Sequence, residues 1–192
     1  RIGVKRDDLT GCILSGNKVR KLEYLVAEAR AEDADVLLSC GGAQSNHCRT
    51  VAAVARRLGL DVELFLREDR APVPDGNLFL DLLLGATIHP LSTLGYADRG
   101  RAMQLRAEEL GAEGRRPYVI PEGGSTPLGS FGYVRCASEI AEHSARTGDR
   151  FDVIVTAVGS GGTLAGLLAG CRVFGLGAEV VGVPVCHDAD HF

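Results

Sequence analysis

Hydrophobic residues occur along this chain in short runs that alternate with stretches of helical spacing. The runs are VLLS (36–39), VELFL (62–66), ATIHPL (86–91), PYVIP (117–121), DVIVTAV (152–158) and EVVGVPV (179–185). Apolar residues at helical spacing lie between them, at Val51, Val54, Ala55 and Leu58, and at Leu164, Leu167, Leu168 and Cys171. This alternation predicts an α/β protein with open parallel sheets and helices on both faces. In such folds, ligands bind where strands end and loops begin.

The segment SGNKVRKLEYLVAEA (15–29) is predicted to be an amphipathic helix. Its apolar stripe consists of Leu22, Leu25, Val26 and Ala29. Ser15 and Asn17 are typical N-terminal caps. Lys18 and Arg20 fall in the predicted first turn, where the helix dipole disfavours cations. Either Lys18 is simply solvated, or its position favours loss of the amine proton and makes it a nucleophile toward carbonyl groups.

Composition excludes several classes of protein. The chain has 192 residues, a mean hydropathy of +0.07 and a net charge of −4. No dense run of Lys and Arg and no long apolar stretch is present, so we expect no nucleic-acid or membrane partner. The cysteines are Cys12, Cys40, Cys48, Cys136, Cys171 and Cys186. None forms a Cys-x-x-Cys pair, which favours reduced, buried thiols in a cytoplasmic protein.

Both ends of the sequence indicate a fragment of a longer protein. The chain begins without Met on RIGVKRDD, which has the pattern of a strand already under way, and it ends soon after another predicted strand. An N-terminal targeting peptide in the longer protein is therefore left open. The polar, Pro-containing stretch 67–77 is predicted to be a mobile surface loop.

The segment SCGGAQSNH (39–47) joins a predicted strand to a predicted helix. Gly41 and Gly42 are expected to form a tight turn that places Ser45 and Asn46 at the helix N-terminus. Free backbone N–H groups there bind anions, and the Asn46 amide can bind an oxygen atom. An ordinary capped helix is the alternative, because Ser and Asn are common caps.

The segment VGSGGTLAG (158–166) has the same strand, glycine turn and helix order, which suits a phosphate. A ligand-free turn and a dinucleotide site are the alternatives. Gly159, Gly161 and Glu179 fit the dinucleotide fingerprint, but Leu164 stands where its third glycine is needed. A nucleotide P-loop does not fit, because no Gly-Lys-Ser/Thr follows.

Two further segments are less specific. In PEGGSTPLGSFGYV (121–134), Gly124 and Ser125 follow a predicted strand and Pro127 opens a helix, which alone indicates a loop. CHDADH (186–191) contains possible zinc ligands, but no matching ligand pair occurs elsewhere, so no metal site is predicted. No partner is evident for His47, His89 or His143, and the sequence lacks a Gly-x-Ser-x-Gly elbow.

A lysine at a helix start, an anion loop that carries Asn and a glycine-rich phosphate loop together suit one cofactor. Pyridoxal 5′-phosphate has an aldehyde, a phosphate and a phenolic oxygen. Lys18 would hold the aldehyde as an imine, the glycine loop would bind the phosphate, and the cofactor would act as an electron sink.

Four segments carry a resemblance to one family of such enzymes. They are KRDDLTG…SGNKVRKLEYL, GGAQSNHCR, PYVIPEGGSTPLGSFGYV and GSGGTLAG. In that order they resemble the D-cysteine desulfhydrase/1-aminocyclopropane-1-carboxylate (ACC) deaminase family, a tryptophan-synthase-β-like, fold-type-II branch of pyridoxal phosphate enzymes. The resemblance covers essentially the whole chain. LSGNKVRKLE and VCHDADHF are most similar to the D-cysteine desulfhydrases.

The resemblance implies roles for individual residues. Lys18 would be the Schiff-base lysine and proton shuttle, and Asn46 would bind the phenolic oxygen. The phosphate would be bound by Gly159, Ser160, Gly161, Gly162 and Thr163. Residues implied in substrate binding are Gln44, Ser45, Asn46, Gly124 and Ser125. The backbone groups of Gln44 and Asn46 would bind the substrate carboxylate. Ser45 matches a serine that is proposed in the deaminase branch as a catalytic base or nucleophile.

The resemblance also implies a domain organisation and an activity. Residues 33–123 would form a small α/β domain, and residues 1–32 with 124–192 part of a large domain that lacks the segment holding the partner of the pyridine nitrogen. D-cysteine would be converted to pyruvate, ammonia and sulfide, in a homodimer with a small amino acid as substrate. ACC deaminase, D-serine deaminase and cysteate sulfo-lyase are alternatives on the same fold. A catalytically inactive binding module and a dinucleotide-binding protein are alternatives from other classes.

Overall fold

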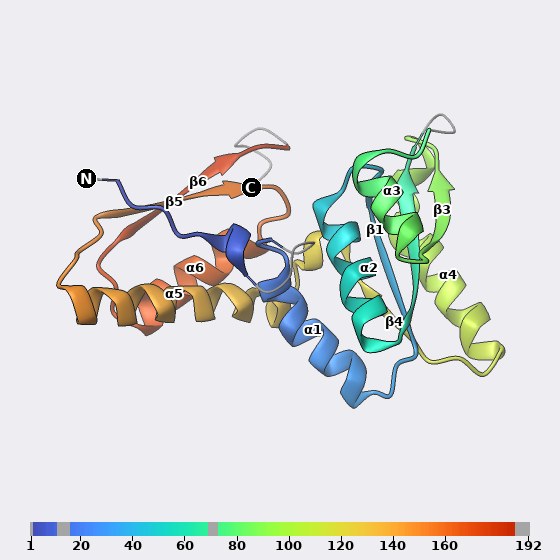
Figure 1. Cartoon of the computed structure of the whole chain (residues 1–192), viewed down its shortest axis with the longest axis horizontal. Coiled ribbons are helices and arrows are strands. Elements are labelled where there is room, and N and C mark those ends of the chain that lie inside the picture. The colour runs from blue at the N-terminus through green and yellow to red at the C-terminus, as the bar shows by residue number, and fades with distance from the viewer. Residues whose placement is uncertain (1, 11–15, 69–72, 187–192) are drawn as a thin grey trace. The chain divides into compact units, whose positions relative to one another are not determined.

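The computed structural model describes residues 2–10, 16–68 and 73–186. The chain divides into two compact units, which are unit 1 (Arg1–Gly124) and unit 2 (Ser125–Phe192) (Figure 1). The predicted assignment of residues 1–32 and 124–192 to one domain, with 33–123 as the other, stays a prediction.

Unit 1 is built on a four-stranded parallel sheet. Its strands are β1 (Val36–Gly42), β2 (Asp61–Arg67), β3 (Thr87–Leu91) and β4 (Pro117–Ile120), in the order β3-β2-β1-β4. Its α-helices are α1 (Val19–Ala31), α2 (Asn46–Leu58), α3 (Gly76–Leu83) and α4 (Arg99–Ala112). Its 3-10 helices are η1 (Asp7–Leu9), η2 (Gly95–Asp98) and η3 (Glu122–Gly124). These elements confirm the predicted α/β organisation.

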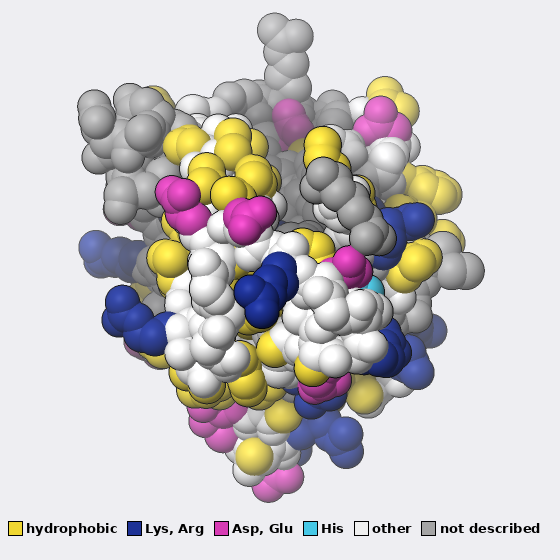
Figure 2. All heavy atoms as spheres, turned by 90° about the vertical axis from the view of Figure 1, so that its left-hand side faces the viewer, with side chains coloured by type: hydrophobic (Ala, Val, Ile, Leu, Met, Phe, Trp, Pro, Cys, Tyr) yellow, Lys and Arg dark blue, Asp and Glu magenta, His cyan; other side chains and the backbone are white. Residues whose placement is uncertain are grey.

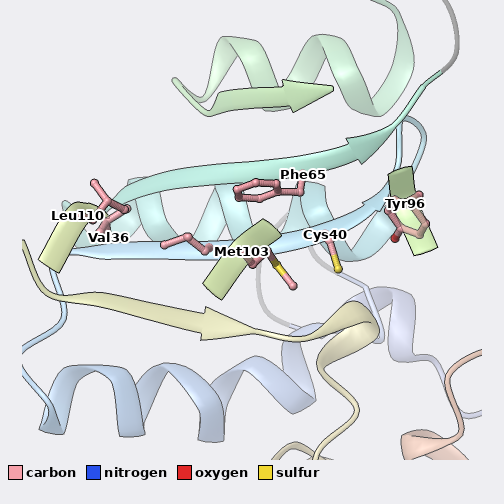
Figure 3. Packing of buried hydrophobic residues seen from close by; sticks show 7 residues of the cluster. Val36, Cys40, Phe65, Tyr96, Met103 and Leu110 are labelled. Atoms are coloured by element: carbon pink, nitrogen blue, oxygen red, sulfur yellow. The ribbon is translucent and has the colours of Figure 1, made fainter. Parts of the chain in front are cut away.

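The central strand β1 is buried on both faces, as expected for a parallel strand covered on each side. Side chains alternate along it, so that Val36, Leu38 and Cys40 lie on one face with Phe65 of β2. Helix α4 covers this face with Met103 and Leu110 (Figure 3). Ser39 lies on the other face, where its hydroxyl contacts a residue of α2. The sheet edge where β1 ends thus leads directly into the start of α2.

Unit 2 contains α5 (Pro127–Thr147), β5 (Val153–Val158), α6 (Gly162–Val173) and β6 (Glu179–Pro184). β5 and β6 pair in parallel. Helices α5 and α6 approach closely, because a Cβ on Gly170 would lie 2.5 Å from the Ala137 Cβ, and a Cβ on Gly166 would collide with the Ser130 carbonyl oxygen. Glycines at these two positions therefore set the helix packing. The predicted start of α5 at Pro127 is confirmed, with Thr126 as its N-cap.

One face of the β5–β6 pair is exposed in the described part of unit 2. Figure 2 shows hydrophobic side chains (yellow) at the surface of the face that it views. Val155 is 66% exposed and Val153 47%, while Ile154 packs on the other face against the helix cluster of Tyr133 and Leu167. Parallel strands are usually covered on both faces, so this pair differs from β1 and β2 of unit 1.

Several local predictions were wrong by a few residues. Helix α1 begins at Val19, so Lys18 and not Asn17 holds the N-cap position, and Ser15 lies outside the described residues. Gly41 and Gly42 belong to β1, because the ladder with β2 continues to its end, and the turn is formed by residues 43–44. Residues 2–6 form no strand, although their pattern predicted one.

The predicted mobile loop 67–77 was wrong at both ends, because Arg67 is the last residue of β2 and α3 begins at Gly76. Asn77 lies in α3, and its backbone N–H donates to the Gln44 side chain at 2.8 Å. Residues 69–72 lie outside the described part of the chain. The loop end is therefore attached to the turn that follows β1.

The cysteines are free thiols where the structure describes them. Cys40, Cys48, Cys136 and Cys171 are buried as predicted, but Cys186 is exposed, contrary to the prediction. Cys12 and the other residues of the CHDADH segment lie outside the description. Within residues 2–10, 16–68 and 73–186, no cluster of three metal-binding side chains occurs, and no helix is long and apolar enough to cross a membrane.

Asp81 on α3 is a buried carboxyl whose two oxygens have no hydrogen-bond partner among the described residues. Burial raises its pKa to about 7, although the nearby Arg49 acts in the opposite direction. In the unfolded chain the Asp81 carboxyl ionises near pH 4. The free energy of unfolding of the wild type therefore falls as pH rises from about 4 to 7, and above pH 7 this loss no longer changes with pH.

Replacing Asp81 by Asn is expected to stabilise the protein at pH 8 by roughly 2–4 kcal/mol, with the difference vanishing near pH 4. Urea unfolding at several pH values measures this. Asp152→Asn, the same change at an exposed position, is the control. A difference between Asp81→Asn and wild type that does not vary with pH would contradict the prediction.

Candidate active site

The start of α1 carries three basic residues in different environments. Arg20 is buried and forms a two-pronged ion pair with Asp7, at 3.0 Å from Nε to Oδ2 and 2.9 Å from Nη2 to Oδ1. Lys18 is half-buried at the N-cap position, and its carbonyl oxygen accepts from the Leu22 N–H at 3.2 Å. The ion pair offsets the unfavourable interaction between the Arg20 charge and the positive end of the helix dipole. It also connects the N-terminal segment to α1.

Lys21 is the most buried of the three, at 1% exposure, and sequence analysis missed it. Its Nζ donates to the Gly123 carbonyl oxygen at 3.2 Å. Burial, and secondarily the charge of Lys18, lowers the pKa of Lys21 to about 7. The signal was present in the spacing, because position 21 precedes Leu25 by four residues and shares its buried stripe.

His47 lies at the start of α2 with its ring buried. The Ser39 hydroxyl donates to the Ile120 carbonyl oxygen at 2.8 Å and contacts His47 Nε2 at 2.9 Å. Nε2 therefore carries the proton, which leaves Nδ1 as a buried acceptor without a partner among the described residues. Burial, helped by the charges of Lys18 and Lys21, lowers the pKa of His47 to about 3, so the ring is neutral.

Gly124 packs directly against this buried group. A Cβ at Gly124 would lie 3.2 Å from Leu25 Cδ1 and 3.5 Å from His47 Cε1, and the backbone φ is +61°. Only glycine fits this conformation without strain. Gly124 therefore fixes the end of η3 beside α1 and the start of α2.

The loop between β1 and α2 places Ser45 and Asn46 as predicted. Ser45 is the N-cap of α2, where its Oγ accepts from the Cys48 N–H at 3.2 Å. Gly41 is required behind it, since a Cβ there would lie 2.6 Å from Ser45 Oγ. Asn46 is exposed and Ser45 half-exposed. The capped-helix interpretation is correct for Ser45, and both side chains remain accessible to a ligand.

The Gln44 side chain is committed to the start of α3. Its Nε2 donates to Asp75 Oδ1 at 2.9 Å, and its Oε1 accepts from the Asn77 N–H. Asn77 Nδ2 donates both to the Gln44 carbonyl oxygen at 2.8 Å and to Asn46 Oδ1 at 3.0 Å. These contacts join α3 to the loop that carries the candidate residues.

In unit 2, the loop between β5 and α6 leads into a helix start that carries backbone N–H donors. Ala165 N–H donates to the Gly161 carbonyl oxygen in the first turn of α6, so the N–H groups of Thr163 and Leu164 precede it at the positive end of the helix. Gly161 has φ +80°, which favours glycine. This donor set suits a phosphate.

Two serine hydroxyls lie at the same helix start. Ser125 Oγ contacts Ser160 Oγ at 2.6 Å and accepts from the Gly162 N–H at 3.3 Å. Leu164, which broke the dinucleotide fingerprint, faces β6, because a Cβ on Gly182 would lie 2.9 Å from its Cδ2. The leucine thus packs helix against strand.

The predicted site residues fall into two sets. Those in unit 1 are Lys18, Gln44, Ser45, Asn46 and Gly124, and those in unit 2 are Ser125, Gly159, Ser160, Gly161, Gly162 and Thr163. Within unit 1 the charge of Lys18 acts on His47 beside Gly124.

His89 and His143, for which the sequence indicated no partner, each contact a carboxylate. His89 contacts Glu63 at 2.6 Å, and His143 contacts Asp149 at 3.2 Å, so both histidines have a structural explanation.

Taken separately, the Lys18 amine in unit 1 suits an aldehyde, and the glycine-rich helix start in unit 2 suits a phosphate. The chain belongs to the family of pyridoxal-phosphate dependent enzymes, because the model of that family matches residues 1–191. Within it, the chain is a homologue of the D-cysteine desulfhydrases and ACC deaminases, as predicted.

Three relatives illustrate this placement. A putative ACC deaminase of Thermotoga maritima is 47% identical over 100% of this chain and 61% of its own length. The mitochondrial bifunctional D-cysteine desulfhydrase/ACC deaminase of Arabidopsis thaliana is 46% identical over 98% of this chain and 49% of its own. The D-cysteine desulfhydrase of Serratia proteamaculans is 43% identical over 96% of this chain and 57% of its own length. The chain thus spans about half the length of the curated relatives it matches.

Solved structures confirm the predicted fold. The crystal structure of an ACC deaminase homologue superposes with a TM-score of 0.86 at 42% identity, over 94% of this chain and 54% of that one. A threonine deaminase shares the fold at 22% identity with a TM-score of 0.71. The chain therefore has the fold-type-II architecture of pyridoxal phosphate enzymes, and it covers about half the length of these solved structures.

Proposed function

We propose that the protein containing this chain is a pyridoxal-phosphate-dependent D-cysteine desulfhydrase that produces pyruvate, ammonia and hydrogen sulfide. The observation that carries the proposal is the donor-rich start of α6, with Thr163 and Leu164 N–H groups at the positive end of a helix. Lys18 at the start of α1 supplies the amine that such a cofactor needs. The names of the Arabidopsis and Serratia relatives support the substrate.

In this proposal the cofactor is bound from three sides. Lys18 would hold the aldehyde carbon through Nζ, and its amine would move the substrate Cα proton. The exposed Asn46 amide donates to the phenolic oxygen. Phosphate is bound by the loop residues Gly159, Ser160, Gly161, Gly162 and Thr163. When bound, the cofactor supplies an electron sink for the charge left on Cα.

The substrate would lie at the start of α2. Backbone groups of Gln44 and Asn46 bind its carboxylate at the positive end of the helix. Ser45 Oγ accepts from the Cys48 N–H, and in this proposal its hydroxyl would donate to the substrate. Gly124 and Ser125 line the pocket in this proposal. A homodimer is part of the same proposal.

ACC deaminase is the second candidate, because the Thermotoga relative is named a putative ACC deaminase and the Arabidopsis relative carries both activities in its name. This reaction gives 2-oxobutyrate and ammonia instead. D-serine deaminase and cysteate sulfo-lyase remain further candidates on the same fold.

A direct assay separates these candidates. The complete gene product is incubated with D-cysteine, L-cysteine, ACC, D-serine and cysteate, and sulfide, sulfite, pyruvate and 2-oxobutyrate are measured. We expect sulfide and pyruvate from D-cysteine alone. 2-Oxobutyrate from ACC at comparable kcat/KM would replace the proposal by the deaminase, and a cofactor-loaded protein inert toward all five would refute the substrate class.

A further inference from the structure

Asn77, on α3, contacts two of the candidate residues although nothing in its sequence pattern indicates a role. It lies in the first turn of α3, and its side-chain Nδ2 is 3.0 Å from Asn46 Oδ1. Its own Oδ1 is 3.0 Å from Arg49 Nη1, on α2. The three side chains form a chain of hydrogen bonds from α2 to α3 and back to the first residue of α2.

The direction of these hydrogen bonds follows from the chemistry of arginine. A guanidinium can only donate, so the atom of Asn77 that faces Arg49 must be the carbonyl oxygen. The atom of Asn77 that faces Asn46 is then the amide nitrogen, which can only donate. Asn46 must therefore accept this hydrogen bond with Oδ1. Its own Nδ2 lies on the side of the amide away from Asn77 and is a donor.

This orientation matters because an asparagine side chain presents either an acceptor or a donor, depending on a rotation of its amide. An exposed Asn46 without partners would adopt both. With Arg49 and Asn77 in place, one face is occupied and the exposed face is a donor. A donor matches an anionic oxygen, whereas an acceptor repels it.

We propose that Arg49 and Asn77 are positioning residues that hold the Asn46 amide with Nδ2 toward the cofactor, so that it selects an anionic phenolic oxygen. The inference rests on the proposed function, because it assumes that Asn46 faces that oxygen. Neither Arg49 nor Asn77 contacts the cofactor in this proposal. Both act through Asn46.

Asn77 also holds the fold of the loop, since its N–H and Nδ2 bind Gln44. A change at Asn77 could therefore weaken binding for a purely structural reason. The test needs a readout that depends on the phenolic oxygen alone.

Asn77→Asp keeps the size and the backbone N–H but replaces the donor by an acceptor. Arg49 can still donate to the carboxylate, while Asn46 must rotate its amide to donate Nδ2 to it. The exposed face of Asn46 then becomes an acceptor. We expect the Kd of pyridoxal 5′-phosphate to rise about 10- to 100-fold, the range for losing a hydrogen bond to a charged group.

The matched probe is the 3-deoxy analogue of pyridoxal 5′-phosphate, which has the aldehyde and phosphate but no phenolic oxygen. Any general repulsion between the new carboxylate and the phosphate affects both ligands equally. We expect wild type and Asn77→Asp to bind the analogue within about twofold of each other, as additivity requires for groups that do not interact. Gln104→Glu, on the exposed side of α4, is the control for an amide-to-carboxylate change.

Asn77→Ala provides a second variant if the aspartate variant folds poorly. It removes the donor without adding charge, and its loss of affinity is expected to lie between wild type and Asn77→Asp. The ratio of visible to near-ultraviolet absorption of the bound cofactor should fall in both variants, because it reports the charge of the phenolic oxygen.

The outcomes are distinct. A loss that is equal for cofactor and analogue would overturn the positioning role and leave the proposed function intact. A loss confined to the cofactor would support it. A wild-type protein that retains no pyridoxal 5′-phosphate would overturn both proposals.

Discussion

Lys18→Ala is expected to abolish covalent retention of pyridoxal 5′-phosphate after borohydride reduction and to lower kcat/KM on the order of 10³-fold. The sequence contains only three lysines, Lys5, Lys18 and Lys21, so the site of attachment can be assigned completely within this chain. Lys18 is half-buried at a helix start, whereas Lys21 is buried against the Gly123 carbonyl oxygen. Mass spectrometry of the reduced protein measures the attachment.

Lys5→Ala and Lys21→Met are the matched variants. Lys5 is exposed, and its replacement is expected to have no effect on covalent retention of the cofactor. Lys21 deserves its own measurement, because a pKa of about 7 makes its amine partly neutral and therefore nucleophilic at neutral pH. Label that persists in Lys18→Ala and disappears in Lys21→Met would move the attachment to Lys21 and overturn the assignment.

Ser160→Asp is expected to weaken binding of pyridoxal 5′-phosphate by at least about a hundredfold. Ser160 is exposed beside the start of α6, where the proposal places the phosphate. Two unit charges 4 Å apart repel by about 4 kcal/mol at an effective dielectric constant of 20, and a phosphate dianion doubles the effect. Titration of the apoprotein with the cofactor, followed by absorbance, gives the Kd.

The same change is expected to leave stability unchanged or slightly raised, since a carboxylate near a helix N-terminus is favourable. Binding and stability thus move in opposite directions, which separates an anion site from a damaged fold. Ser160→Asn, neutral and of similar size to Asp, is the control. Equal Kd values for the Asp and Asn variants would show that the phosphate binds elsewhere.

The pattern of the sequence predicted the strands and the helices that follow them, because buried parallel strands and amphipathic helices differ in period. It also predicted Ser45 as a cap and Pro127 as the first residue of a helix. It missed boundaries that depend on pairing: Gly41 and Gly42 look like a turn, yet the ladder with β2 holds them in β1.

The candidate site was predictable where a residue acts through its local sequence. Glycines at a helix start and a lysine at a helix cap are visible in a single segment. Lys21, His47 and Asn77 were missed because their importance depends on contacts across 102, 8 and 31 residues of sequence, respectively, with Gly123, Ser39 and Asn46. Such contacts exist only after the sheet has brought the segments together.

The exposed face of the β5–β6 pair has a practical consequence for work with these residues. A polypeptide limited to residues 1–192 presents Val153 and Val155 beside strand edges that β5 and β6 leave unpaired in the described part of unit 2. Unpaired edges next to apolar side chains are templates for self-association during synthesis and refolding. The yield and solubility of such a polypeptide, and its tendency to form inclusion bodies, would therefore depend on how these edges and side chains are covered.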